Sequence, residues 1–277
     1  MIRLENIDIE MEGRKILENV SFQVPTGHTK VVLGPSGAGK SSLLKIILGL
    51  WKPDSGSVFV DNLEITGLSE REQMPVRRRM SMVFQGNALF DSLTVEENVG
   101  FFLGEHSQLP DDEIRRRVDA CLEFVNLPGT NDLLPEELSG GMKKRVAIAR
   151  AIAFDPEAIL YDEPTTGLDP INAKTVTELV MKLKKERGVT SVIVTHILRD
   201  AFAVGDSLAL MDGGRIVFDG TPAKLLACPD RFVQENHPAK VPEIIALPIT
   251  GGEKNYLDWL GANTLFSKTH DDPNLPL

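Results

Sequence analysis

The chain has 277 residues, the composition of an ordinary globular protein, and a formal net charge of -10 from 40 acidic and 30 basic side chains. A field of this sign repels DNA, RNA and anionic lipid headgroups, so we expect no nucleic acid partner. The only cysteines, Cys121 and Cys228, lack metal-ligand spacing, which favours a reducing compartment such as the cytoplasm. No apolar run reaches the roughly 20 residues needed to span a bilayer.

The amino-terminal part of the chain predicts strands around a glycine-rich loop. Loose apolar alternation around Leu4 and Ile9, and then at residues 21–24, is typical of half-exposed strands. Residues 31–33 form a short apolar strand that enters the loop directly, and residues 41–50 have the length and spacing of a helix. Two further apolar segments, at 58–60 and 80–84, also predict strands.

The middle of the chain predicts helices and then a return to strands. From about residue 93 to 155 the pattern is helical, with one apolar stripe along residues 111–125, so we expect an inserted helical subdomain. The apolar strands that follow are 158–161, 191–195 and 207–211, with a closing strand at 215–220. A helix at 172–187 lies between the first two, and such alternation predicts a parallel sheet covered on both faces.

Residues 237–277 are rich in proline, so we expect an irregular extension after a domain at residues 1–236. The extension contains Tyr256, Trp259 and Phe266. Aromatic side chains on such a segment require burial, and our hypothesis is that they dock on a neighbouring subunit.

The sequence GPSGAGKS at residues 34–41 predicts a phosphate-binding loop. Its glycines let successive N–H groups point at phosphate oxygens, Lys40 would bridge the terminal phosphates, and Ser41 would bind Mg²⁺. The alternative is a glycine-rich turn with an exposed lysine, but the strand before the loop and the helix after it favour nucleotide binding. The expected phosphate contacts are Gly34, Pro35, Ser36, Gly37, Ala38, Gly39, Lys40, Ser41 and Ser42.

Two adjacent acids, Asp162 and Glu163, end the apolar strand AILY. Ligands of parallel sheets collect at the carboxyl ends of the strands, so we expect Asp162 to bind Mg²⁺ directly or through water. Glu163 is placed to orient or deprotonate the attacking water. Alone, such a pair is as often a solvated turn; together with the phosphate loop, it indicates hydrolysis.

A set of motifs in one order resembles the ATP-binding-cassette ATPases over about residues 2–236. The motifs are GPSGAGKS, Gln85 after MSMVF, LSGGM at 138–142, LYDEP at 160–164, GLDP at 167–170 and His196 after SVIVT. The resemblance implies an α/β P-loop NTPase fold of the ABC type, with a parallel core sheet, an antiparallel β flank and an inserted helical subdomain. It also implies hydrolysis of MgATP by a head-to-tail dimer of two copies.

The resemblance implies a second phosphate contact in the partner copy. Ser139, Gly140 and Gly141 would cap the ATP bound to the opposite subunit, while Ser139 also serves as an ordinary N-cap of its own helix. Asp169 would couple the two sites across the interface, or would only cap the helix after Pro170.

Two more residues gain roles only through the resemblance. Gln85 would contact Mg²⁺ or the attacking water and report the nucleotide state to a partner, whereas a lone Gln is usually a surface residue. His196 would bind the γ-phosphate, although a lone His at a strand end is more often structural.

Two positions depart from the family pattern. Met142 stands where the signature usually has Gln, which removes one polar contact from the site in the partner copy. The position of the ring that stacks on adenine holds Met11, with no aromatic residue nearby, so the sequence leaves GTP open beside ATP.

The sequence around Met142 and Gln85 is most similar to that of the ATPases of MCE-associated phospholipid transporters, of the maintenance-of-lipid-asymmetry type. This implies a membrane permease bound at residues 85–93, an MCE-type substrate-binding protein in the complex, and a cytoplasmic location on the inner face of the cell membrane. The alternatives are an importer ATPase for another solute and a soluble cassette ATPase. Basic runs at 77–79 and 115–117 are typical of solvated helix faces, with a partner or lipid contact as the alternative.

Overall fold

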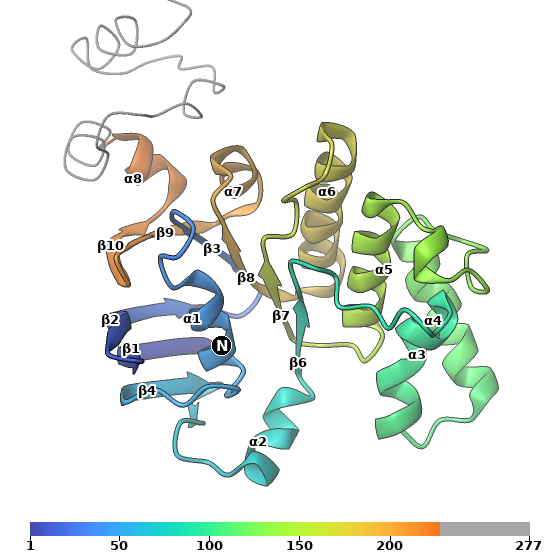
Figure 1. The fold of residues 1–277 in the computed structure, drawn as a ribbon, viewed down its shortest axis with the longest axis horizontal. Helices are drawn as coiled ribbons and strands as arrows, with labels where there is room; N and C mark the ends of the chain where they lie inside the picture. The colour runs from blue at the N-terminus through green and yellow to red at the C-terminus, as the bar shows by residue number, and fades with distance from the viewer. Residues whose placement is uncertain (228–277) are drawn as a thin grey trace, which may run out of the picture.

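The computed structural model describes residues 1–227, in which two sheets are combined with helices (Figure 1). The larger sheet has six strands in the order β10-β9-β3-β8-β7-β6. Their bounds are β3 Thr29–Leu33, β6 Met80–Val83, β7 Ala158–Asp162, β8 Thr190–Thr195, β9 Ser207–Asp212 and β10 Arg215–Gly220. All neighbours pair in parallel except β10, which runs antiparallel to β9. The predicted α/β fold with a parallel core sheet is confirmed.

The smaller sheet is antiparallel, in the order β2-β1-β4-β5. Its strands are β1 Ile2–Met11, β2 Arg14–Val24, β4 Ser55–Val60 and β5 Leu63–Glu64. The β1–β2 register shifts along the pair, and Asn6 and Asn19 adopt positive φ values of 50° and 51°. These irregularities interrupt the period-2 pattern, which is why the sequence predicted only loose, short strands here.

The helices are α1 Lys40–Ile47, α2 Glu70–Arg77, α3 Val95–His106, α4 Asp111–Phe124, η1 Pro135–Glu137, α5 Gly140–Ile152, α6 Pro170–Arg187, α7 Leu198–Val204 and α8 Pro222–Ala227. Helix α1 is shorter than the predicted 41–50 because Gly49 takes a positive φ of 67°. Helix α2 was not predicted, although Ser69 and Glu72 form a capping box at its start.

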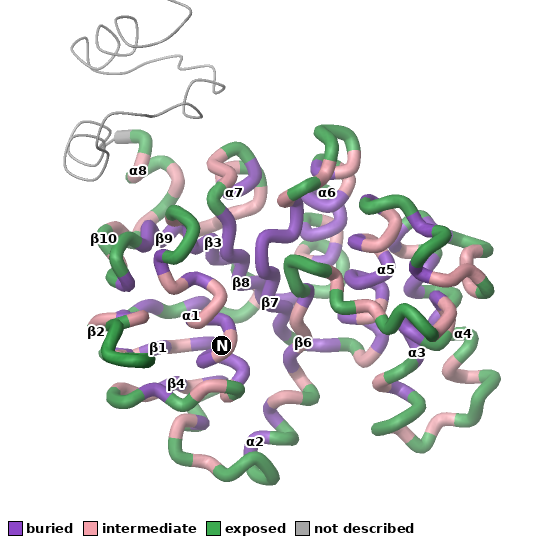
Figure 2. The backbone as a smooth tube through the Cα atoms, viewed as in Figure 1, coloured by how far each residue is buried: buried purple, intermediate pink, exposed green. Residues whose placement is uncertain are grey.

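The core consists of two apolar clusters on opposite faces of the larger sheet. The central strands of this sheet are mostly buried, shown in purple in Figure 2. Side chains alternate along β3, so Val31 and Leu33 pack with α3 to α6, whereas Val32 packs with α1 and the antiparallel sheet. Each such side chain contributes about 1.5–3 kcal/mol when fully buried. The sheet is therefore covered on both faces, as predicted.

Helices α3, α4 and α5 pack against one another beside β6, at one end of the larger sheet (Figure 1). They fall in the region predicted as a helical subdomain; the division into domains stays a prediction. The predicted docking residues Tyr256, Trp259 and Phe266 lie outside the described residues. Within residues 1–227, every helix is too short or too polar to cross a bilayer.

Candidate active site

The polar residues singled out by the sequence meet at one edge of the larger sheet. In the parallel registers Leu33 pairs with Thr195, Val83 with Tyr161, and Asp162 with Val194. The segments that leave β3, β6, β7 and β8 therefore start at the same edge. These segments carry the glycine loop, Gln85, Glu163 and His196.

The glycine loop connects β3 to α1 with a sharp turn. Gly39 is the N-cap of α1, with φ of 100°, and a Cβ there would lie 2.7 Å from Ile16 O. Only glycine fits this conformation and this close approach. Lys40 is buried, and its Nζ donates to Gly34 O at 2.8 Å and to Pro35 O at 3.1 Å. The ammonium thus lies over the loop that is expected to bind phosphate.

Ser41 and Asp162 form a pair of oxygen ligands beside the loop. Ser41 Oγ donates to Asp162 Oδ1 at 2.9 Å, and the Asp162 carboxyl is buried. Burial raises the pKa of Asp162, although the hydrogen bond from Ser41 opposes this rise. A hydroxyl and a carboxylate are the hard oxygen donors that Mg²⁺ prefers, so the residues present fit this ion.

Glu163 lies between three polar side chains. Its Oε1 is 3.5 Å from Lys40 Nζ, and its Oε2 accepts from Thr166 Oγ1 at 2.9 Å and lies 3.0 Å from His196 Nδ1. Burial acts to raise the pKa of Glu163, but the contacts with His196 and Thr166 outweigh it and leave the pKa below its usual value. The carboxylate is therefore ionised at neutral pH and available as a base.

The structure thus brings Lys40, Ser41, Asp162, Glu163 and His196 together. Sequence reasoning missed Thr166, whose only signal was its place three residues after Glu163.

Gln85 lies at the same edge but on the exposed loop that follows β6. Its backbone carbonyl accepts from the buried Lys144 Nζ at 2.9 Å. Burial lowers the pKa of Lys144 to about 8. No role for Lys144 was predicted from the sequence, because there it is only one member of the basic run MKKR.

Ser139, Gly140 and Gly141 form the start of α5, away from the glycine loop of the same chain. Ser139 Oγ accepts from Met142 N at 3.3 Å, which confirms the predicted N-cap geometry. Helix α5 belongs to the apolar cluster on one face of the sheet and α1 to that on the other, and the two are well separated in Figure 1. One chain alone therefore does not place Ser139 over its own glycine loop.

Asp169 caps α6 and lies close to the start of α5. Its side chain accepts from Ile171 N and Asn172 N, and from Asn172 Nδ2 at 2.6 Å. The hydrogen bond from the Asn172 side chain is the largest of the causes that lower the pKa of Asp169. A Cβ on Gly141 would lie 2.2 Å from Asn172 Oδ1, so the two helix starts are in close contact.

Comparison with known proteins identifies the family of the chain. A family model described as "ABC transporter" matches residues 17–166, more than half of the 277 residues. The chain belongs to the ABC transporter family. As a member of this family it is an ATPase, the ATP-binding subunit of a transporter, and the resemblance stated from its motifs is confirmed. A second family model, "CutA1 divalent ion tolerance protein", matches residues 218–263, too short a part of the chain to assign a family.

Three similar proteins illustrate the range of this ABC family. The intermembrane phospholipid transport system ATP-binding protein MlaF of Haemophilus influenzae is 40% identical over 235 residues, which is 84% of this chain and 89% of that protein. The methionine import ATP-binding protein MetN of Carboxydothermus hydrogenoformans is 42% identical, over 86% of this chain and 69% of that protein. Among solved structures, the dimeric post-hydrolysis cassette MJ0796 bound to ADP and Pi is 34% identical, with a TM-score of 0.74 and coverage of 80% of this chain and 98% of that one.

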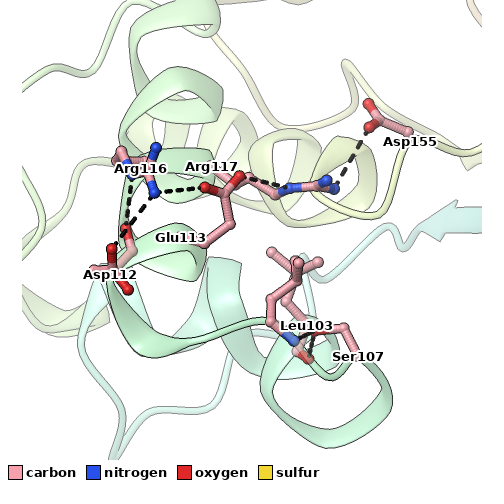
Figure 3. Close-up of polar contacts among 8 residues, drawn as sticks. Leu103, Ser107, Asp112, Glu113, Arg116, Arg117 and Asp155 are labelled. Carbon is pink, nitrogen blue, oxygen red and sulfur yellow. Dashed lines mark hydrogen bonds and ion pairs between the residues drawn. The ribbon is translucent and has the colours of Figure 1, made fainter.

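The arginines of the two basic runs in this ABC ATPase contact other residues of the same chain. Arg77 donates to Leu48 O and Gly49 O at the end of α1, and Arg79 pairs with Glu157 and Asp61. In the second run, Arg116 contacts Asp112 and Glu113, while Arg117 reaches Glu113 and Asp155 (Figure 3). Ion pairs within the chain therefore engage Arg79, Arg116 and Arg117, and main-chain carbonyls engage Arg77.

The two departures from the family pattern have different surroundings. Met142 is partly buried and packs against the apolar cluster of the helical region. Met11 ends β1 and is 37% exposed. The hairpin that follows Met11 leads to Ile16, whose carbonyl approaches Gly39 of the glycine loop.

Proposed function

We propose that the chain hydrolyses MgATP in a site shared by two copies and uses the cycle to drive a phospholipid-transporting membrane permease. The observation that carries the hydrolytic part is the meeting of Lys40, Asp162, Glu163 and His196 at one sheet edge. Phosphoryl transfer depends mainly on positioning and on compensation of negative charge, and this group supplies both.

Each residue has a part defined by its contacts. The N–H groups of the glycine loop and the Lys40 ammonium bind the phosphate oxygens. Glu163 accepts the proton of the attacking water, and Thr166 and His196 hold its carboxylate in place. His196, partly exposed beside Glu163, contacts the γ-phosphate.

Mg²⁺ would be held by Ser41 and Asp162, with Gln85 as a further ligand from the loop after β6. When bound, the ion neutralises charge on the phosphate oxygens. A few protein oxygens used together with substrate phosphates are typical of Mg²⁺ sites in nucleotide enzymes.

The second copy completes the site. Ser139, Gly140 and Gly141 present a hydroxyl and helix-start N–H groups, and in our proposal these bind the ATP held by the partner. Asp169, at the start of the adjacent helix, contacts the partner at the same interface. The dimeric state of the similar cassette MJ0796 supports this arrangement.

The permease contact lies around residues 85–93. Phe84, Phe90 and Phe101 are exposed there, and the rings of Phe90 and Phe101 are 4.7 Å apart at their centroids. Apolar side chains grouped on a surface mark interaction sites. We propose that a permease segment covers them on the inner face of the membrane, with an MCE-type protein as a further member of the complex.

Phospholipid is the substrate best supported, because MlaF proteins are 38–40% identical to this chain and the match covers most of their length. The signature LSGGM and the segment around Gln85 resemble that branch. The methionine importer MetN is as similar in identity and supplies the second candidate.

Co-purification in mild detergent tests the assignment. We expect the tagged full chain to bring down a membrane permease, and proteoliposomes of that complex to transfer fluorescent phospholipid when MgATP is added. The matched control is the complex with Glu163→Gln, which should bind ATP and the permease but should not transfer phospholipid. Uptake of methionine without lipid transfer would support the importer, and a soluble dimer without a permease would contradict a transport role.

A further inference from the structure

Helix α5 carries two cationic side chains that point to the loop after β6. Lys144 is only 2% exposed, and Arg150 is partly buried. A buried cation must find acceptors, because burial without them is unfavourable. Both residues find theirs in residues 84–88, the first part of the loop between β6 and α3, which contains Gln85.

The partners are main-chain carbonyls. Lys144 Nζ donates to Phe84 O at 3.1 Å and to Gln85 O at 2.9 Å. Arg150 donates through Nη1 to Ala88 O at 2.7 Å and through Nη2 to Asn87 O at 2.9 Å. Four carbonyls of residues 84–88 thus accept hydrogen bonds from one helix.

These contacts act on the backbone of the loop. Asn87 and Ala88 adopt positive φ values of 65° and 51°, a conformation that L-residues avoid unless their surroundings impose it. Hydrogen bonds from charged donors are roughly twice as strong as neutral ones, so they can impose it. The loop is therefore tied to α5, even though it leaves the sheet at β6.

Helix α5 also begins with Ser139, the proposed contact to the partner's ATP. A rigid helix that carries Ser139 at its start and grips the Gln85 segment with its later turns joins two functional groups. We propose that Lys144 and Arg150 are positioning residues that make Ser139 and Gln85 move as one body. This inference rests on the proposed function of those two residues.

The test compares variants of the full chain in steady-state hydrolysis of MgATP. Lys144→Met keeps an unbranched side chain that is one atom shorter and removes the N–H donors. Arg150→Met also removes the donors but shortens the side chain further. We expect kcat to fall roughly 10- to 100-fold in each, the effect of a misplaced active-site group. KM for ATP should stay within about threefold, because the glycine loop is untouched. Lys144→Arg, which restores charged donors, should recover part of kcat.

Arg145→Met is the matched control, because Arg145 lies on the same helix but donates to Val125 O and Asn126 O at the end of α4. Arg145→Met should lower the free energy of unfolding by about as much as Lys144→Met does, and its kcat should equal that of wild type. Hydrogen exchange of residues 84–94 should be faster in Lys144→Met than in wild type and unchanged in Arg145→Met.

The inference would be overturned if Lys144→Met kept the kcat of wild type, or if Arg145→Met lost as much kcat as Lys144→Met. Neither result would affect the proposed function, provided that the wild-type chain hydrolyses MgATP. If wild type failed to hydrolyse MgATP, the proposed function would fall. The hydrogen-exchange measurement would then still decide whether Lys144 holds the loop after β6 against α5.

Discussion

Glu163 is held by its backbone as well as by its side chain. Its φ of 48° lies in the left-handed region, at a cost of order 1–3 kcal/mol for such a residue. The hydrogen bond from Glu163 N to Val194 O and the side-chain contacts to Thr166 and His196 hold it there. Strain of this kind clusters at active sites, which agrees with the proposed role as base.

Glu163→Gln separates binding from turnover. The amide keeps the size of the side chain but cannot accept the proton, so we expect kcat to fall by roughly 10² to 10⁴. ATP affinity, measured by equilibrium binding without turnover, should change little because the glycine loop remains intact. Full hydrolytic activity in this variant would remove Glu163 from the mechanism.

At this scale the sequence predicted residues whose chemistry is visible in a motif. Ser41 contacts Asp162, and Lys40 Nζ lies 3.5 Å from Glu163 Oε1, so the phosphate loop and the acidic pair are adjacent. Thr166 and Lys144 could not be predicted, because their roles depend on which oxygen lies within reach after folding. A threonine in a turn and a lysine in a basic run carry no local signal of that kind.

Among the elements, the starts of α5 and α6 are the most closely fitted pair. Gly141→Ala would push Asn172 away and disturb its hydrogen bond to Asp169. Overpacking costs about 1–3 kcal/mol, and helix propensity returns up to about 1 kcal/mol, so we expect net destabilisation. In a double-mutant cycle by urea unfolding, Asn172→Ala should relieve most of this loss. Additive effects would show that the two helix starts do not interact.

Asp206 joins the start of β3 to the end of α6. It accepts from Thr29 N at 2.7 Å and pairs with Lys184 at 2.5 Å. Burial acts to raise the pKa of Asp206, but the contacts with Lys184 and Thr29 N outweigh it, so the pKa lies below its usual value. A depressed carboxyl pKa stabilises the fold above the unfolded-state pKa of about 3.9, and this contribution is lost as pH falls through the folded-state pKa.

We therefore expect Asp206→Asn to lose roughly 0.5–1 kcal/mol at pH 7, a figure reduced for the partial exposure of the pair. The difference from wild type in urea midpoint should shrink as the pH is lowered below about 4. A difference that stayed constant down to acid pH would exclude the ion pair as its cause.

Elements with continuous apolar runs were predictable, and those with mixed patterns were not. Strands β7, β8 and β9 are buried on both faces along their central residues, so each contains a continuous apolar run. Helix α2 contains Pro75 and is mostly polar, which conceals its helical period, and it depends on its capping box instead. Strand β5 has two residues, too few for any pattern.

At the scale of the whole molecule, the two groups that we propose bind nucleotide lie in different layers. The glycine loop precedes α1 on one face of the larger sheet, and Ser139 starts α5 on the other. Two copies related by a two-fold axis can place each Ser139 opposite the partner's loop, which yields two equal sites. The central claim is that hydrolysis takes place in these composite sites.

Mixed dimers made from differently tagged chains test this claim most directly. In the distributed dimer, one chain carries Lys40→Met and the other Ser139→Ala; in the concentrated dimer, one chain carries both and the other is wild type. If sites are composite, the distributed dimer keeps one intact site and about half the activity, while the concentrated dimer loses both sites. If instead the concentrated dimer retained activity and the distributed dimer lost it, each chain would contain a complete site, contrary to our account.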